Sequence, residues 1–237
     1  MVVNVLYRRY IFKGFSVMFS RNLRFEIVQG TILSTLESCI RLVAKAEKEL
    51  DAEQKHFECK MDGIPDSLSS LDDTEHPPQT IDEYWDLYES FPNIRRQAEI
   101  INVYSVLEYG LKSLCNAYEK SLNGKEIVGK WYLADSLNHL KKYISIDMSD
   151  MRHWKEVISI QELRNKLIHD NGTIDLRNEN LTRYIGENEH LSLDSGNRVA
   201  ISAGYTEQCY QLVFDFFIEL FSICPKYNRA GSGAVAK

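Results

Sequence analysis

The sequence predicts an all-α helical bundle with one small β-hairpin late in the chain. Apolar residues recur at steps of three and four over several long segments, which is the period of a helix that buries one face. Helix stops follow two of these segments, at Asn123-Gly124 and Asn171-Gly172. With 237 residues, of which 44% are hydrophobic and 26% charged, the chain has the composition of a globular protein with a substantial core.

The first predicted helix runs from about Phe25 to Cys59, and its later part is strongly charged, so we expect that end to project into water. Residues 61–78 are rich in glycine, proline, serine and aspartate and are expected to form a loop. Thr80 and Glu83 have the spacing of a capping box, which predicts a short acidic helix to about Phe91.

The rest of the chain is predicted to be helical except for one hairpin. Helices are expected over residues 94–122, 130–146, about 150–169, about 178–186 and about 205–223. The last of these is nearly all apolar, which predicts a helix buried on most sides. Residues 190–202 alternate around Ser195-Gly196-Asn197 and predict the hairpin.

These elements suggest four parts: a basic leader over 1–25, expected to be poorly ordered, an N-terminal helical extension and loop over 26–91, a bundle core over 92–228, and a flexible tail over 229–237. The leader carries five Lys or Arg residues and no acid before Glu26. It is compatible with a targeting segment, a disordered extension, or a start site annotated upstream of Met18.

Charge and cysteine usage exclude several classes of protein. The net charge of -6 argues against a protein that coats nucleic acid through bulk charge, although a local basic site is compatible with it. The five scattered cysteines include no CxxC pair, which favours reduced thiols in a cytoplasmic protein over disulfides or a zinc site. No apolar run approaches the ~20 residues that span a bilayer, so no membrane partner is expected.

The most informative segment is Glu162–Gly172, which contains Arg164, Asn165 and His169. At about 100° per residue, Arg164 and Asn165 fall within the apolar arc of the predicted helix and His169 falls on its edge. Polar groups on a buried stripe need partners or face a cavity or interface. Asn165 precedes His169 by four residues, so its amide is expected to orient the imidazole.

A carboxylate is expected to support this group. Glu108 falls on the edge of the apolar face of the predicted helix 94–122. Because a carboxylate there needs a cation, we expect Arg164 to be its partner across the bundle.

These residues resemble the signature of the HEPN superfamily (higher eukaryotes and prokaryotes nucleotide-binding domains). That signature is an arginine, a polar residue and then a histidine, here Arg164, Asn165 and His169. The preceding helix with Glu108 also looks like the family's earlier helix, and the resemblance covers about residues 92–223. It implies a helical bundle that forms a homodimer in which two motifs face each other.

Many members of that family are metal-independent endoribonucleases of toxin–antitoxin, antiviral and other defence systems, and some are inactive scaffolds. The resemblance therefore implies RNA as substrate, no metal or other cofactor, and an antitoxin or defence protein as a further partner. His169 would be the acid or base and Arg164 would stabilise the phosphate, and Asn165 would orient His169 or contact the phosphate. The alternative is a catalytically inactive HEPN-like module that dimerises or binds a nucleotide or a partner. One branch of the family has a tyrosine two residues after the histidine, where this chain has Asn171.

Other patterns compete with this interpretation. A second Arg…His match, Arg183 and His190, crosses a glycine and enters a predicted strand. Glu53 and His56 form one ExxH pair, whereas a di-metal bundle needs two such helical pairs. His139 and His153 are expected to be surface histidines on helices. For the motif itself, the structural alternative is an ion pair of Arg164 and a histidine that caps the helix.

Overall fold

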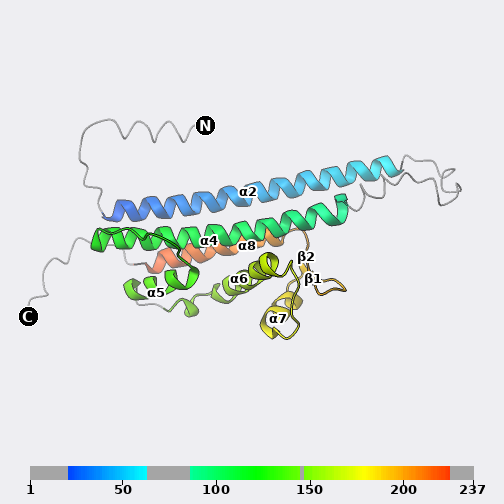
Figure 1. Cartoon of the computed structure of the whole chain (residues 1–237). Helices are drawn as coiled ribbons and strands as arrows, with labels where there is room; N and C mark the ends of the chain where they lie inside the picture. Colours follow the sequence, from blue (N-terminus) through cyan, green and yellow to red (C-terminus); the bar gives the residue numbers. More distant parts are fainter. Residues whose placement is uncertain (1–20, 63–85, 145–146, 225–237) are drawn as a thin grey trace, which may run out of the picture.

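The computed structural model describes residues 21–62, 86–144 and 147–224, and this part of the chain is mostly helical, as predicted (Figure 1). The elements in chain order are α2 (Arg21–Asp62), η2 (a π-helical turn, Asp86–Ser90), α4 (Phe91–Asn123), α5 (Leu133–Ile144), η3 (a 3-10 turn, Met148–Asp150), α6 (Trp154–His169), α7 (Glu179–Glu187), β1 (Leu191–Leu193), β2 (Val199–Ile201) and α8 (Tyr205–Ile223). The predicted late hairpin is confirmed: β1 and β2 are antiparallel, with Ser192 opposite Ala200.

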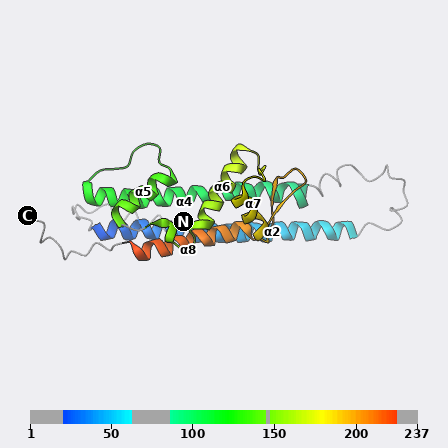
Figure 2. The ribbon, with the colours of Figure 1, turned by 90° about the horizontal axis from the view of Figure 1, so that it is seen from below.

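The two longest helices form one layer of the molecule. α2 and α4 run side by side in opposite directions, α8 packs against both, and α5, α6 and α7 lie on the other side of α4 from α2 (Figures 1 and 2). α2 spans about 63 Å at 1.5 Å per residue, so it is longer than the helices that it covers. The core is therefore built along α4, which touches α2, α5, α6 and α8.

α4 and α8 approach each other closely at a glycine. A Cβ atom added to Gly110 would lie 2.6 Å from Cζ of Phe217, which is fully buried. Leu107, Leu111 and Phe216 pack around this contact and are also fully buried. The contact between α4 and α8 therefore depends on the missing side chain of Gly110.

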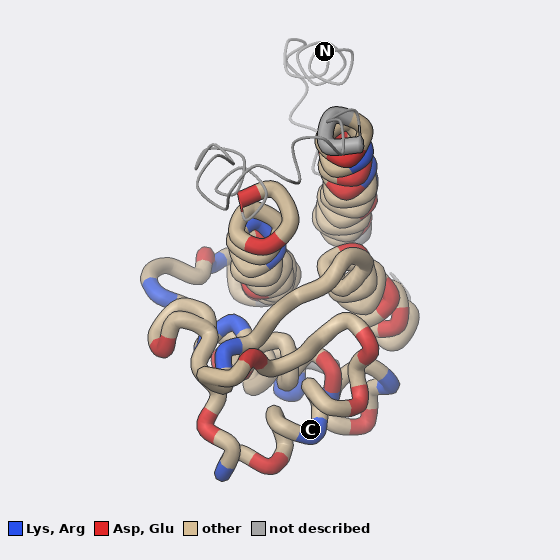
Figure 3. Tube along the Cα trace, turned by 90° about the vertical axis from the view of Figure 1, so that its right-hand side faces the viewer, with Lys and Arg blue, Asp and Glu red and all other residues tan. Residues whose placement is uncertain are grey.

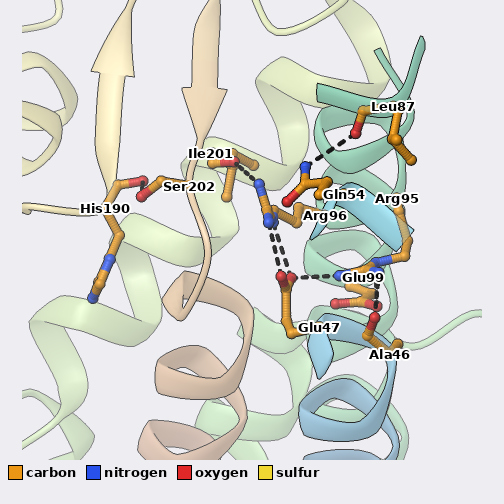
Figure 4. A network of polar contacts seen from close by, with 10 residues as sticks. All are labelled: Ala46, Glu47, Gln54, Leu87, Arg95, Arg96, Glu99, His190, Ile201 and Ser202. Carbon is orange, nitrogen blue, oxygen red and sulfur yellow. Dashed lines mark hydrogen bonds and ion pairs between the residues drawn. The ribbon is translucent and has the colours of Figure 1, made fainter. Parts of the chain in front are cut away.

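The charged half of α2 is fixed to the bundle at one carboxylate. Glu47 accepts hydrogen bonds from Arg96 Nε at 2.9 Å and Arg96 Nη2 at 2.7 Å, and it also pairs with Arg95 (Figure 4). Arg96 Nη1 reaches the carbonyl oxygen of Ile201 in β2 at 3.2 Å. α2, α4 and the hairpin are thus joined by one network. Beyond Leu50 most residues of α2 to Cys59 are exposed, as expected for an end that projects into water, and charges of both signs lie there (Figure 3).

Several element boundaries differ from expectation. The helix expected over 94–122 begins earlier, at Phe91, and holds Pro92 in its first turn, where a missing N–H costs no hydrogen bond. Residues Arg21–Phe25, which fall in the expected leader, form the first turns of α2, and Phe25 packs edge-on against Tyr118 and Phe221. Residues 1–20, the capping box at Thr80 and Glu83, and the expected tail at 229–237 lie outside the described residues.

One described helical stretch, Arg24–Cys59, has the length and composition that a membrane-spanning helix would have. This is weak evidence, because core helices and signal sequences can have the same composition.

Candidate functional site

The motif lies in the last two turns of α6. Val157, Ile160, Leu163 and Leu167 are the buried residues of α6, which packs against α4 and α8. The helix ends at His169, and the chain then turns through Asn171 (φ 50°) and Gly172 (φ 76°), whose N–H donates to the carbonyl oxygen of Lys166 at 2.9 Å. A left-handed residue with this bond is a common helix stop, which confirms the predicted end of the motif helix.

Arg164 is half-buried and is held by two neighbours. Its guanidinium lies over the ring of Tyr104 in α4, 5.2 Å from the ring centroid, and Nη1 donates to Oδ1 of Asn165 at 3.0 Å. Its Nε is buried and has no hydrogen-bond partner. Among the residues that the structure describes, no carboxylate oxygen lies within 4.0 Å of Arg164. The group is an oriented cation that is not neutralised by a direct ion pair.

Asn165 is exposed, so its expected place on a buried stripe is wrong for the isolated chain. The packing of α6 covers only part of its apolar arc, and Ile168 on the uncovered part is 42% exposed. The side-chain oxygen of Asn165 accepts a hydrogen bond from Arg164, and within the described chain no hydrogen bond joins Asn165 to His169. Asn165 therefore orients the arginine here, whereas the sequence predicted that it would orient the histidine.

His169 is exposed at the C-terminal end of α6. Next to it in the chain, Asp170 forms an ion pair with Lys166, with Oδ2 and Nζ 2.7 Å apart. That pair raises the pKa of Lys166 and keeps its charge engaged with Asp170. The imidazole is exposed to solvent, and it follows Arg164 by five residues, which is about 1.4 helical turns.

Glu108 is half-buried and lies close to this group without forming the expected ion pair with Arg164. Between them is Tyr104, which is 2% exposed. Burial raises the pKa of Tyr104, the charge of Glu108 and a hydrogen bond to it raise that pKa further, and Arg164 and Gln161 act in the opposite direction. Glu108 and Arg164 therefore both act on the pKa of Tyr104, in opposite directions.

The sequence argument missed Tyr104 and Gln161 as members of this group. A signal for them existed, because Tyr104 precedes Glu108 by four residues and Gln161 precedes Arg164 by three, which places each pair on one helix face. Pairing an arginine with a tyrosine across two helices requires knowledge of their packing.

The residues of the competing sequence patterns do not form a comparable site. Arg183 is exposed on α7 and donates to Asn180 at 3.2 Å, whereas His190 precedes β1 and its ring lies against Gly204. Glu53 and His56 are exposed on α2, and the described part of the chain holds no cluster of three or more residues that could bind a metal ion.

His139 is not the surface histidine that the sequence suggested. Its side chain is 10% exposed, and its Nε2 lies 3.0 Å from Oε1 of Glu119. The ring of Trp131 packs edge-on against it, with the centroids 5.7 Å apart. His153 is half-buried and directly precedes α6.

No family model matches this chain, and the comparisons with curated proteins and with solved structures find no similar protein.

Proposed function

We propose that this protein is a metal-independent endoribonuclease of the HEPN type that acts in the cytoplasm, in a defence or toxin–antitoxin system. The main support for the proposal is that Arg164 is half-buried, oriented and not paired directly with a carboxylate of the described chain. Burying part of a guanidinium group costs free energy unless the group pairs with an anion or binds a ligand. The guanidinium of Arg164 is oriented by Tyr104 and Asn165 and has no direct carboxylate partner among the described residues. A phosphodiester next to an accessible histidine would satisfy it.

In the proposed reaction the 2'-oxygen of a ribose attacks the adjacent phosphorus and the bond from phosphorus to the 5'-oxygen breaks. A histidine accepts the proton of the 2'-hydroxyl, and an acid donates a proton to the leaving 5'-oxygen. Arg164 stabilises the negative charge that builds up on the phosphorane. The products are a 2',3'-cyclic phosphate and a 5'-hydroxyl end.

One copy of the motif supplies a single imidazole, whereas the reaction uses both a base and an acid. A homodimer in which two α6 helices face each other would supply both from two copies of His169. The exposure of Ile168, directly before His169, supports a partner on this face.

A second candidate function is an inactive HEPN-like module that dimerises or binds a nucleotide or a partner protein. The net charge of -6 favours this candidate, because RNA is attracted more strongly by basic surfaces. The buried Nε of Arg164 favours it as well, since that donor is not open to a ligand in this arrangement.

The two candidates are separated by RNA cleavage in the presence of a chelator. Wild type, Arg164→Ala and His169→Ala are incubated with structured RNAs, and the ends of the products are analysed. We expect wild type to give cyclic phosphates and both variants to be slower by about 100-fold or more. Arg177→Ala and His153→Ala serve as matched controls outside the site. Absence of cleavage by wild type, or undiminished cleavage by His169→Ala, would exclude the enzymatic function and favour the module.

A further inference from the structure

A furrow runs along α2, and over its first two hollows it lies between α2 and α4. Three hollows follow one another along it, with volumes of about 820, 190 and 300 Å³. The first lies beside Ile27 and Ala117, the second between Thr35 and Tyr109, and the third on α2 as far as Leu42. The furrow thus follows α2 from its first turns to its middle.

Four hydroxyl groups in the furrow are already used within their own helices. Thr31, Thr35 and Ser38 in α2 each donate to the carbonyl oxygen four residues earlier, at 2.8, 2.9 and 2.7 Å, and Ser105 in α4 does the same at 2.8 Å. Their remaining surface is mainly methyl and methylene groups. The furrow is therefore more apolar than its residue types suggest.

Large apolar side chains stand exposed along the same surface. Leu42 is 67% exposed, Tyr109 69% and Ile27 41%. Only 17% of the most apolar 18-residue window of α2 is buried. No Asp, Glu, Lys or Arg lines the second and third hollows. The first hollow also includes Arg24 and Lys120, so the apolar part of the furrow is the stretch from Thr31 to Leu42. An exposed apolar surface of this kind marks an interaction site.

We infer that a second copy of this chain covers the furrow, with the two α2 helices antiparallel about a two-fold axis beside Ser34 and Thr35. The residues along α2 are arranged symmetrically about that point. Ile27 and Leu42 are equally far from it, and so are Thr31 and Ser38. A two-fold axis therefore brings the large side chains together at each end and the small ones together at the centre, as a self-complementary interface requires.

The size of the furrow sets the strength of this contact. The stretch from Ile27 to Leu42 is about 24 Å long and two adjacent helices are about 20 Å wide, so each copy would bury about 500 Å². The total of about 1,000 Å² is the lower limit of a specific interface. We therefore expect a reversible dimer that depends on concentration.

The charges at the ends of the furrow are compatible with this pairing. An antiparallel arrangement places Arg24 of one copy level with Lys45 of the other, a like charge. Glu49, whose carboxylate lies 3.4 Å from the Lys45 ammonium, is one helical turn farther along and within reach of the long Arg24 side chain. Glu49 can then lie between two cations. α6 lies on the other side of α4 from α2, so this contact does not compete with the pairing of two motifs and does not rest on the proposed function (Figure 1).

Cross-linking tests the geometry. In a Cys39→Ala, Cys59→Ser background, Ser34→Cys is treated with a short bifunctional maleimide, and Glu53→Cys on the same helix is the matched control. Two copies of position 34 would be adjacent, whereas two copies of position 53 would be about 55 Å apart at 1.5 Å per residue. We expect a covalent dimer for Ser34→Cys and none for Glu53→Cys. No dimer at position 34, or equal dimer at both positions, would overturn the inference.

Sedimentation equilibrium tests the surface in the unmodified chain. Ser34→Arg places a charge in the furrow and is expected to raise the dimer dissociation constant at least tenfold, or to leave a smaller assembly. Ala52→Arg, at an exposed position beyond the furrow, is expected to behave as wild type. Both substituted positions are exposed in the structure, and circular dichroism checks that the variants fold.

Three outcomes would contradict the inference, and the last two would also assign the furrow to another occupant. Ser34→Arg could leave association unchanged, or a monomer could bind phospholipid vesicles in a manner that Ser34→Arg abolishes. Hydrogen exchange could also show residues 27–42 protected at every concentration until residues 1–20 are deleted, which would identify the chain's own N-terminal segment.

Discussion

Arg164 of α6 lies over the aromatic ring of Tyr104 of α4, with its guanidinium carbon 5.2 Å from the ring centroid. The ring is almost fully buried, and its hydroxyl group lies near Glu108 and Gln161. Tyr104 thus presents an apolar face to the cation and a polar edge to the carboxylate. This arrangement fixes the direction of the arginine without neutralising it directly.

Tyr104→Leu and Tyr104→Phe separate these two contributions. The leucine variant loses the cation–π contact, worth about 0.5–2 kcal/mol, so we expect RNA cleavage to fall by roughly 2- to 30-fold. The phenylalanine variant keeps the ring face and is expected to cleave within about twofold of wild type. Affinity for a non-cleavable 2'-deoxy oligonucleotide, measured by fluorescence anisotropy, and thermal unfolding distinguish a site effect from a folding effect. Equal affinity in Tyr104→Leu and wild type would contradict this role.

Asn165→Ala removes the hydrogen bond that holds Nη1 of Arg164. Because Asn165 is exposed, the loss is expected to be about 0.5–1 kcal/mol, or roughly two- to fivefold in RNA affinity. Asn165→Asp keeps an acceptor at the same place and is the matched control. Since the contact is to the arginine, we expect the pH dependence of cleavage to be unchanged in Asn165→Ala. A shifted pH profile would instead indicate that the amide acts on His169.

Glu47→Gln is expected to destabilise the protein at neutral pH by about 1–3 kcal/mol, because Arg95 and Arg96 then lose their shared anion. Burial acts to raise the pKa of Glu47, but hydrogen bonds and charge interactions with the two arginines outweigh it and lower that pKa. The stability that this carboxylate contributes is present above its unfolded-state pKa and is lost as the pH falls through its lower folded-state pKa. Urea unfolding at pH 7 and below pH 4 measures the difference in free energy of unfolding between wild type and Glu47→Gln. We expect this difference to be smaller at the acidic pH.

Glu99 in the same network is the contrasting control. Burial raises its pKa, against the effects of Thr206 and Arg95, so its protonated form is favoured in the folded state. Its contribution is fully present below the unfolded-state pKa and is lost as the pH rises through the folded-state pKa. Glu99→Gln is therefore expected to gain stability relative to wild type as the pH rises above about 4.5. If Glu99→Gln instead lost stability relative to wild type as the pH rises, the raised pKa of Glu99 would be contradicted.

Gly110→Ala tests the contact between α4 and α8. The new methyl group would meet the buried ring of Phe217, so we expect a loss of about 1–3 kcal/mol in the free energy of unfolding. Adding Phe217→Leu should make the effect of Gly110→Ala smaller. Gly30→Ala is the matched control, because a Cβ there meets nothing within 4 Å and should stabilise α2 by about 0.5–1 kcal/mol. The effects are measured by urea or thermal unfolding, and a neutral Gly110→Ala would contradict the close approach.

The helices and the hairpin were predictable because their causes are local. A helix stop needs a residue that accepts a positive φ, and Gly124 (φ 67°) and Gly172 (φ 76°) stand where the sequence placed them. The turn of the hairpin similarly contains Asn197 at φ 58°. The start of α4 was predicted three residues too late, because proline both ends and begins helices, and the difference depends on the residues that precede it.

The sequence by itself determined the helical class, the hairpin and the spacing of Arg164, Asn165 and His169, because hydrophobic period and turn chemistry act over a few residues. The tertiary structure decided which part of each helix is covered. It left Asn165 exposed, placed Tyr104 between Glu108 and Arg164, and left the furrow of α2 and α4 open. A helical period fixes the angles between side chains on one helix, but burial depends on where the neighbouring helices lie.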